Sequence, residues 1–260
     1  RDIENAKFIL RFDDADHADL KPIHDTEYAK HYFEEFSKRY NFDFNIKISN
    51  NLSAAAMVLN NTQTLVLKKN HKYSNNQLSV LANHEIGVHM VTTFNGLSQP
   101  LKVFSNGFPN NVETQEGLAV YSEYMSGSLT MYRLRELAFR VIAADSLSKG
   151  YDFVDTFDLL YRQYKVNRDK AFSITQRIHR GGGFTKDFLY LTGLRNVYKY
   201  AKNDGDLGKL LMGKVCMSYI PTIEKLIDLG LAIPPKHFTD AYLKNDNTNP
   251  NLEFILSGLK

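Results

Sequence analysis

This chain is constrained most by the stretch His84-Glu85-Ile86-Gly87-Val88-His89, which sets two histidines and a glutamate inside one predicted helix. Ser74 and Gln77 have the form of a capping box, because the Ser74 hydroxyl can accept an N–H three residues on and Gln77 can reach back. Asn95-Gly96 is the αL-tolerant pair typical of the end of a helix. We therefore predict one helix over residues 74–95, about 20 residues and roughly 30 Å long.

The spacing of the histidines departs from the usual His-Glu-x-x-His pattern of zinc peptidases, in which the ligands at i and i+4 share a helix face. His84 and His89 are five residues apart, which separates them by roughly 140° around a regular helix. A one-residue insertion in the form of a π-bulge would return both to one face. Gly87 between them tolerates irregular backbone, so we predict a bulge or widened turn at residues 86–88.

Glu85 strengthens the interpretation of this stretch as a metal site. Two histidines in a half-buried helix arise often by chance. A carboxylate that faces the interior of a protein needs a partner, however, and a zinc-bound water is one such partner. These three residues alone do not fix a function.

A second stretch, Glu113-Thr114-Gln115-Glu116-Gly117-Leu118-Ala119, offers the third protein ligand that catalytic zinc commonly has beside a water. We predict a helix here that is capped by Asn110, with Glu113 at its N3 position, and that runs to about Met125. Glu116 is the preferred ligand, because the small residues Gly117 and Ala119 beside it would let the two metal-binding helices approach closely.

Two further glutamates lie on this predicted helix. Glu123 is seven residues after Glu116 and shares its face, so we predict that it accepts a hydrogen bond from a ligand histidine. The alternative exchanges these roles, with Glu123 as the ligand and Glu116 as the outer partner. Glu113 is predicted to lie on a solvated face.

The two motifs together are similar to those of the family known by its QEGLA motif, here Gln115-Glu116-Gly117-Leu118-Ala119. Its bacterial members are called flavohaemoglobin expression-modulating proteins, and its animal members include the microtubule-associated tyrosine carboxypeptidases, which remove the C-terminal tyrosine of α-tubulin. The resemblance extends from about residue 25 onward. It implies a compact zincin fold in which His84, His89 and Glu116 hold one Zn2+ per chain and Glu85 is the general base.

The remaining periodicity predicts an α+β fold that is mostly α. An amphipathic helix over 26–40 precedes three strands at 42–48, 54–59 and 64–67, which form a small sheet before the metal-binding helix. From residue 112 the chain reads as helical, at 132–144, 155–166, 168–180, 185–202 and 220–229. No repeat or linker divides it, so we expect a single gluzincin-like domain over 1–260, with an N-terminal sheet and a C-terminal helical bundle.

Three segments are candidates for binding a peptide. In zincins an edge strand of such a sheet pairs with extended substrate, and residues 54–57 or 64–68 suit that part, although either can equally be a scaffold strand. The loop over 96–111 joins the two motifs and is a candidate wall of the cleft. Neither the edge strand nor the loop indicates which residue the enzyme would remove.

Side chains near the end of the 168–180 helix suit recognition of a free C-terminus. Arg177 or Arg180 could bind a carboxylate through a bidentate fork, and the glycines at 181–183 would let a peptide approach. His179 or Tyr190 could donate a hydrogen bond to the developing oxyanion. The alternative is structural, because cations and glycine both favour helix C-termini.

Composition excludes several classes of function. A formal net charge of +3 gives no case for nucleic-acid or membrane binding, and there is no apolar run of about 18 residues that could span a bilayer. The lone Cys216 excludes an intrachain disulfide and favours a reducing compartment such as the cytoplasm. The chain starts at Arg1 rather than Met, which indicates a fragment or processed form, and the acidic cluster at 13–17 is expected to be a solvated loop.

The sequence therefore predicts a zinc-dependent metallopeptidase that acts on the C-terminus of a peptide or protein, with a carboxypeptidase favoured over an endopeptidase or aminopeptidase. The animal relatives suggest an aromatic leaving residue. A zinc-containing regulator without catalysis is the competing class, and it would need four protein ligands and no bound water.

Overall fold

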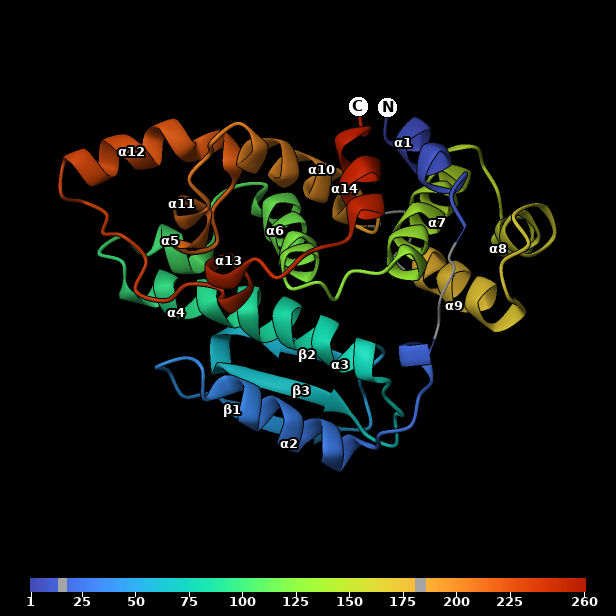
Figure 1. The fold of residues 1–260 in the computed structure, drawn as a ribbon, viewed down its shortest axis with the longest axis horizontal. Helices are drawn as coiled ribbons and strands as arrows, with labels where there is room; N and C mark the ends of the chain where they lie inside the picture. Colours follow the sequence, from blue (N-terminus) through green and yellow to red (C-terminus); the bar gives the residue numbers. More distant parts are fainter. Residues whose placement is uncertain (14–17, 181–185) are drawn as a thin grey trace.

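One helical rod organises the structure, a computed structural model that describes residues 1–13, 18–180 and 186–260. The rod consists of α3 (Asn75–Leu81), the π-helical segment η3 (Ala82–Met90) and α4 (Val91–Ser98) in direct succession. It lies between the sheet and the helices that follow it in the chain (Figure 1). The Ser74 hydroxyl accepts from the Gln77 N–H at 3.0 Å as predicted, but the Gln77 side chain lies against His71 instead of completing a capping box.

The rod does not end at Asn95-Gly96, which corrects the predicted boundary, because tertiary packing accounts for both residues. The buried Asn95 amide donates to the carbonyls of Leu211 and His237 at 2.8 and 2.7 Å. A Cβ on Gly96 would come within 2.7 Å of the Phe104 carbonyl oxygen. These residues therefore join α4 to neighbouring segments and leave the helix to continue for another two residues, to Ser98.

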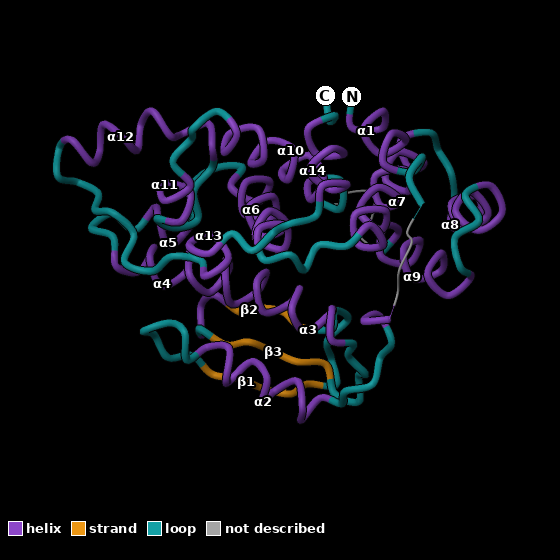
Figure 2. The backbone as a smooth tube through the Cα atoms, viewed as in Figure 1, coloured by secondary structure: helices purple, strands orange, loops and turns teal. Residues whose placement is uncertain are grey.

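The sheet has three strands in the order β1-β3-β2, namely β1 (Asn45–Ser49), β2 (Ala56–Leu59) and β3 (Thr64–Lys68). β1 pairs parallel with β3, and β2 pairs antiparallel with it. Figure 2 shows the strands together beneath the rod. Since β3 is central, residues 64–68 cannot be an edge, and of the two candidate strands only the segment around 54–57 lies at one.

Apolar side chains hold the sheet, α2 (Thr26–Ser37) and the rod together. Leu65 and Leu67 are two residues apart and therefore share a face of β3. They belong to the same buried cluster as Phe33 of α2 and Ile86 of η3. This cluster fixes the position of the rod against the sheet.

The chain beyond the rod is helical, as predicted from residue 112 onward. The helix predicted at 155–166 lies at 153–163, where an α-helical segment runs without a break into a π-helical one. The helix predicted at 185–202 begins at Leu189. Thr185 lies outside the described residues, as do residues 14–17 of the predicted acidic loop. Within the described ranges no helix has the length and apolar character needed to cross a bilayer. The described helices not yet given are α1 (Asp2–Ile9), η1 (Ala18–Leu20), η2 (Asn60–Thr62), α5 (Val103–Asn106), α6 (Asn111–Met125), α7 (Met131–Ser148), α8 (Phe153–Asp158), η4 (Leu159–Gln163), α9 (Arg168–His179), α10 (Leu189–Lys202), α11 (Leu207–Leu211), η5 (Met217–Tyr219), α12 (Ile220–Asp228), α13 (Asp240–Lys244) and α14 (Pro250–Ser257).

Helix α6 packs directly against α10 (Figure 1), and a glycine of each helix lies at this contact. A Cβ on Gly117 would lie 2.2 Å from the Gly193 carbonyl carbon, and a Cβ on Gly193 would lie 2.2 Å from the Glu113 carbonyl oxygen. The expectation that Gly117 lets α6 approach the other metal-binding helix is therefore wrong, because its close neighbour is α10. Asn110 is the N-cap residue and Glu113 is at N3, as predicted, but Asn110 has a left-handed backbone and its side chain makes no capping hydrogen bond.

Gly117→Ala is expected to lower the free energy of unfolding by about 1–3 kcal/mol or more, because backbone rather than a movable side chain occupies the space. Urea denaturation measures the effect. Gly87→Ala is the matched control in a helical segment, since its Cβ would meet no atom closer than 3.6 Å. Equal stability of the two variants would contradict the packing argument.

Candidate metal centre and adjoining cavity

The widened turn of η3 brings His84 and His89 to one side of the rod. Their ring centroids are 5.0 Å apart, and the π-helical stretch covers Ala82–Met90 rather than only the three residues predicted. Gly87 is not among the residues with positive φ, and an added Cβ would meet only ordinary contacts. The widened turn therefore does not depend on glycine. The turn itself was predicted from the spacing of the two histidines.

Glu116 completes a cluster of three candidate ligands. One ligand atom each of His84, His89 and Glu116 lies within 4.8 Å of the others. Glu116 Oε2 is 3.4 Å from His84 Nε2 and 3.6 Å from His89 Nε2, and this buried oxygen has no hydrogen-bond partner. An orphaned oxygen that faces two imidazole nitrogens fits a metal ion with His2Glu ligation.

Electrostatics favour the ionised form of Glu116. Burial opposes ionisation, but the neighbouring imidazoles of His84 and His89 hold the pKa of the Glu116 carboxyl well below its usual value. Lys186 Nζ lies 2.5 Å from the second oxygen, Oε1. One oxygen of Glu116 is thus engaged by a cation, and the other points to the space between the histidines.

Glu123 contacts His84, as the sequence predicts for it. Its Oε1 lies 2.8 Å from His84 Nδ1, and Arg133 donates to both of its oxygens at 3.1 and 3.2 Å. Since Glu123 contacts the nitrogen of His84 that faces away from Glu116, the geometry favours Glu116 over the alternative ligand. Glu113 is half-buried and accepts from Asn196 at 2.6 Å, so its predicted solvated setting is wrong.

Glu85 lies beside this cluster in the wall of a cavity. Its Oε2 accepts a hydrogen bond from the backbone N–H of Val58 in β2 at 3.1 Å. The carboxylate is half-buried, and the edge strand fixes its direction. A carboxylate held this way can exchange a proton with a molecule in the cavity.

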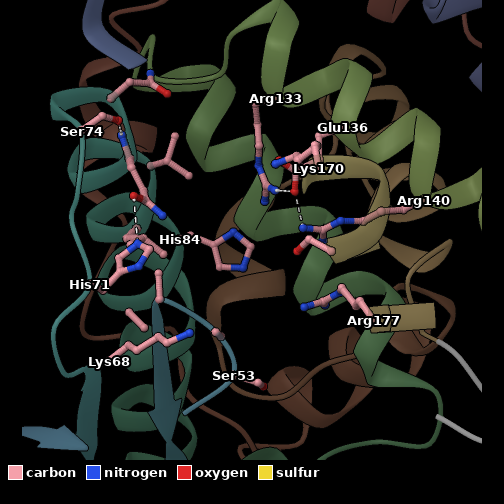
Figure 3. A pocket seen from close by; sticks show the side chains of 18 of the residues that line it. Ser53, Lys68, His71, Ser74, His84, Arg133, Glu136, Arg140, Lys170 and Arg177 are labelled. Carbon is pink, nitrogen blue, oxygen red and sulfur yellow. Dashed lines mark hydrogen bonds and ion pairs between the residues drawn. The ribbon is translucent and has the colours of Figure 1, made fainter. Parts of the chain in front are cut away.

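The cavity has a volume of about 820 Å³ and runs between two unlike walls. Figure 3 shows Lys68, His71 and Ser74 on one side, the cations of α7 and α9 on the other, and His84 between them. Residues 53–56 beside β2 also line it, whereas none of residues 96–111 does, so the expectation that this loop forms a wall is wrong. The cations that line the α7–α9 wall are Arg133, Arg140, Lys170, Arg177 and Arg180.

The predicted substrate-binding residues divide into two groups. Arg177, Arg180 and Tyr190 line the cavity. Arg177 pairs with Asp187, and its Nη2 lies 3.5 Å from the Tyr190 hydroxyl. The Tyr190 ring lies 6.3 Å from that of His84, and burial and then the charge of Glu116 raise the pKa of its hydroxyl.

His179 does not contribute to the cavity lining, which corrects its assignment as an oxyanion donor. Its Nε2 lies 3.0 Å from the Thr156 hydroxyl, and its ring packs near Phe153 of α8. His179 follows Arg177 by two residues, which is a rotation of about 200° around the helix and turns its side chain away from the face that carries Arg177. The glycines at 181–183 lie outside the described residues.

Several residues of the site were missed from the sequence. Arg133, Glu136 and Arg140 lie three and four residues apart, so they share one face of α7, and that spacing was an available signal. Lys186 and Lys214 join the site from distant segments with no local signal. Burial lowers the pKa of Lys214 to about 7.

Glu136→Gln is expected to lower the free energy of unfolding at pH 7 by about 3–5 kcal/mol, because it removes the buried carboxylate that Arg133, Arg140 and Lys170 share. Burial opposes ionisation, but Arg140, Lys170 and Arg133 hold the pKa of Glu136 below its usual value of 4.5. Its contribution is therefore present above that value and is lost as pH falls through the folded-state pKa. Urea denaturation between pH 3 and pH 7 should show a weaker acid dependence for the variant, whereas the exposed control Glu35→Gln should behave as wild type.

Comparison with known proteins gives one family. The family model described as microtubule-associated tyrosine carboxypeptidase matches residues 1–260, the whole chain. The similarity therefore includes the first 24 residues, whereas the sequence motifs led us to expect it only from about residue 25 onward. A search of curated proteins gave no match.

Proposed function

The chain belongs to the microtubule-associated tyrosine carboxypeptidase family, and from this membership we propose that it is a zinc-dependent carboxypeptidase that removes one C-terminal residue from a peptide or protein. The family establishes a peptidase of carboxypeptidase type. The observation that carries the zinc proposal is the orphaned Glu116 Oε2 opposite two histidine nitrogens. The rod lying against a small sheet suits the proposed zincin arrangement.

His84, His89 and Glu116 would hold the metal and leave a fourth position open. Bound zinc would supply a water with a pKa of about 7 and would polarise the scissile carbonyl. Glu85 takes a proton at its carboxylate and passes it to the leaving amine. The N–H of Val58 keeps Glu85 oriented throughout.

The cations of the α7–α9 wall would bind the free C-terminus of the substrate. Arg177 and Arg140 both lie near the Tyr190 ring, at 5.9 and 5.6 Å from its centroid, and the buried Nε of Arg140 has no hydrogen-bond partner. Guanidinium groups match a carboxylate geometrically. We propose that the terminal carboxylate binds there, with Tyr190 as a donor to the developing oxyanion.

The excess of cations also indicates the class of substrate. Five cations and Glu136 line the α7–α9 wall, and Lys68 lines the opposite wall. An acidic C-terminal peptide complements this charge, and strand addition along residues 54–57 would orient its backbone. From the family description we propose tyrosine as the residue removed.

Mass spectrometry of peptides incubated with the zinc-loaded protein tests the proposal. An acidic peptide that ends in tyrosine should lose that residue alone, and the same peptide with an amidated C-terminus should remain intact. Internal cuts would instead indicate an endopeptidase. No cleavage by a protein that has bound zinc would favour the regulator, although the three clustered ligands of the described residues are fewer than a structural zinc site requires.

A further inference from the structure

Gln115 is a buried residue of the second motif that the proposed chemistry does not use. It is 4% exposed and does not line the cavity. Its Oε1 lies 2.9 Å from the Thr92 hydroxyl of α4, and its Nε2 donates to the Gly213 carbonyl at 3.2 Å. Gln115 therefore connects α6 to the rod and to the segment that precedes Lys214.

Lys214 reaches the rod from that segment. Its Nζ donates to the His89 carbonyl at 2.9 Å and to the Thr92 hydroxyl at 2.9 Å. The side chain is buried, with 7% of the residue exposed, and no carboxylate of the described residues forms an ion pair with Nζ. Burying an amino group away from any carboxylate is unfavourable unless hydrogen bonds compensate it, so packing alone does not account for a lysine at this position.

The carbonyl that Lys214 contacts lies where the rod changes its period. His89 is the penultimate residue of η3, and regular α-helix resumes at Val91. A change from π to α spacing disturbs the backbone pairing of the rod. Here side chains supply donors to the His89 carbonyl, from Lys214 and from the Thr93 hydroxyl at 2.7 Å.

We propose that Lys214 is a positioning residue for the metal centre: through the His89 carbonyl and Thr92 it holds the end of the widened turn, and so directs the His89 imidazole toward Glu116. Gln115 supports this unit by fixing Thr92 and the backbone next to Lys214. The inference rests on the proposed function only in taking His89 as a metal ligand. It adds a group that touches neither the metal nor the substrate.

Metal binding by the 260-residue chain tests this role independently of peptidase activity. In equilibrium competition with a chromogenic chelator, Lys214→Met should weaken zinc binding about 10–100-fold, the usual effect of losing an outer partner of a ligand. The visible spectrum of the Co2+-loaded variant should also differ from wild type, because the geometry at His89 changes. Lys225→Met, at an exposed site in α12, is the control and should match wild type in both measurements.

Thr92→Val keeps the inference falsifiable if Lys214→Met does not fold, because it removes the hydroxyl and leaves the ammonium. Thr92→Val should also weaken zinc binding. If Lys214→Met folds, the variant that carries both substitutions should lose less zinc-binding free energy than the sum of the two single losses, since the two residues act as one unit. Wild-type zinc affinity and Co2+ spectrum in a folded Lys214→Met, or in Thr92→Val, would overturn the inference. Wild-type protein that binds zinc but cleaves no peptide would contradict the proposed function alone.

Discussion

Glu85→Gln is expected to retain zinc and to lower kcat by about 10²–10⁴-fold, the usual contribution of a general acid–base group. The amide oxygen of glutamine can still accept from the Val58 N–H, which is 3.1 Å from the carboxylate in the wild type. The shape of the wall is therefore preserved, and only the capacity to take a proton is lost. Steady-state kinetics on an acidic peptide ending in tyrosine, together with zinc content per chain, measure both expectations.

The control for Glu85→Gln is Glu27→Gln, an exposed change of the same chemistry on α2. It should leave kcat and zinc content unchanged. Glu85→Gln with wild-type turnover would remove Glu85 from the mechanism. Loss of zinc from Glu85→Gln would mean that the carboxylate supports the metal centre rather than the proton transfer.

The widened turn was predictable because it follows from local geometry. A separation of five positions cannot place His84 and His89 on one face of a regular helix, so convergence required a change of helical period. The same reasoning placed Glu123 on the face of Glu116, where it meets His84 Nδ1 at 2.8 Å. Each of these inferences depends on angles within a single helix.

The errors concern residues whose role depends on distant segments. Asn95-Gly96 has the sequence of a helix end, yet Asn95 binds the carbonyls of Leu211 and His237 instead. Gly117 was assigned to the wrong neighbouring helix, because its sequence does not show that Gly193 faces it. Local sequence patterns indicate which residues are unusual, but their structural role depends on the distant residues that they contact.

The α7–α9 wall is a third case, in which the sequence pattern was present but fitted both a solvated face and a binding site. The spacing of Arg133, Glu136 and Arg140 marks one face of α7, and such a face is most often solvated. In the fold this face is turned toward the cavity, with Lys170 of α9 opposite Glu136. Sequence periodicity predicts that residues share a face, and only packing tells whether that face meets solvent or a binding site.

Glu116→Ala is expected to abolish peptidase activity and to weaken zinc binding by more than about 100-fold, since loss of an outer partner alone costs 10–100-fold. It removes the oxygen that lies 3.4 Å from His84 Nε2 and 3.6 Å from His89 Nε2. Zinc competition and peptide cleavage provide the measurements. Glu113→Gln, one turn earlier on α6, is the control and should retain both properties.

Glu123→Ala separates the two glutamates of α6. Because Glu123 contacts Nδ1 of His84 rather than the side that faces Glu116, its loss should weaken zinc binding by only about 10–100-fold. The expected order of zinc affinity is wild type, then Glu123→Ala, then Glu116→Ala. The reverse order of the two variants would make Glu123 the ligand and Glu116 the outer partner, and would require His84 to bind the metal through its other nitrogen.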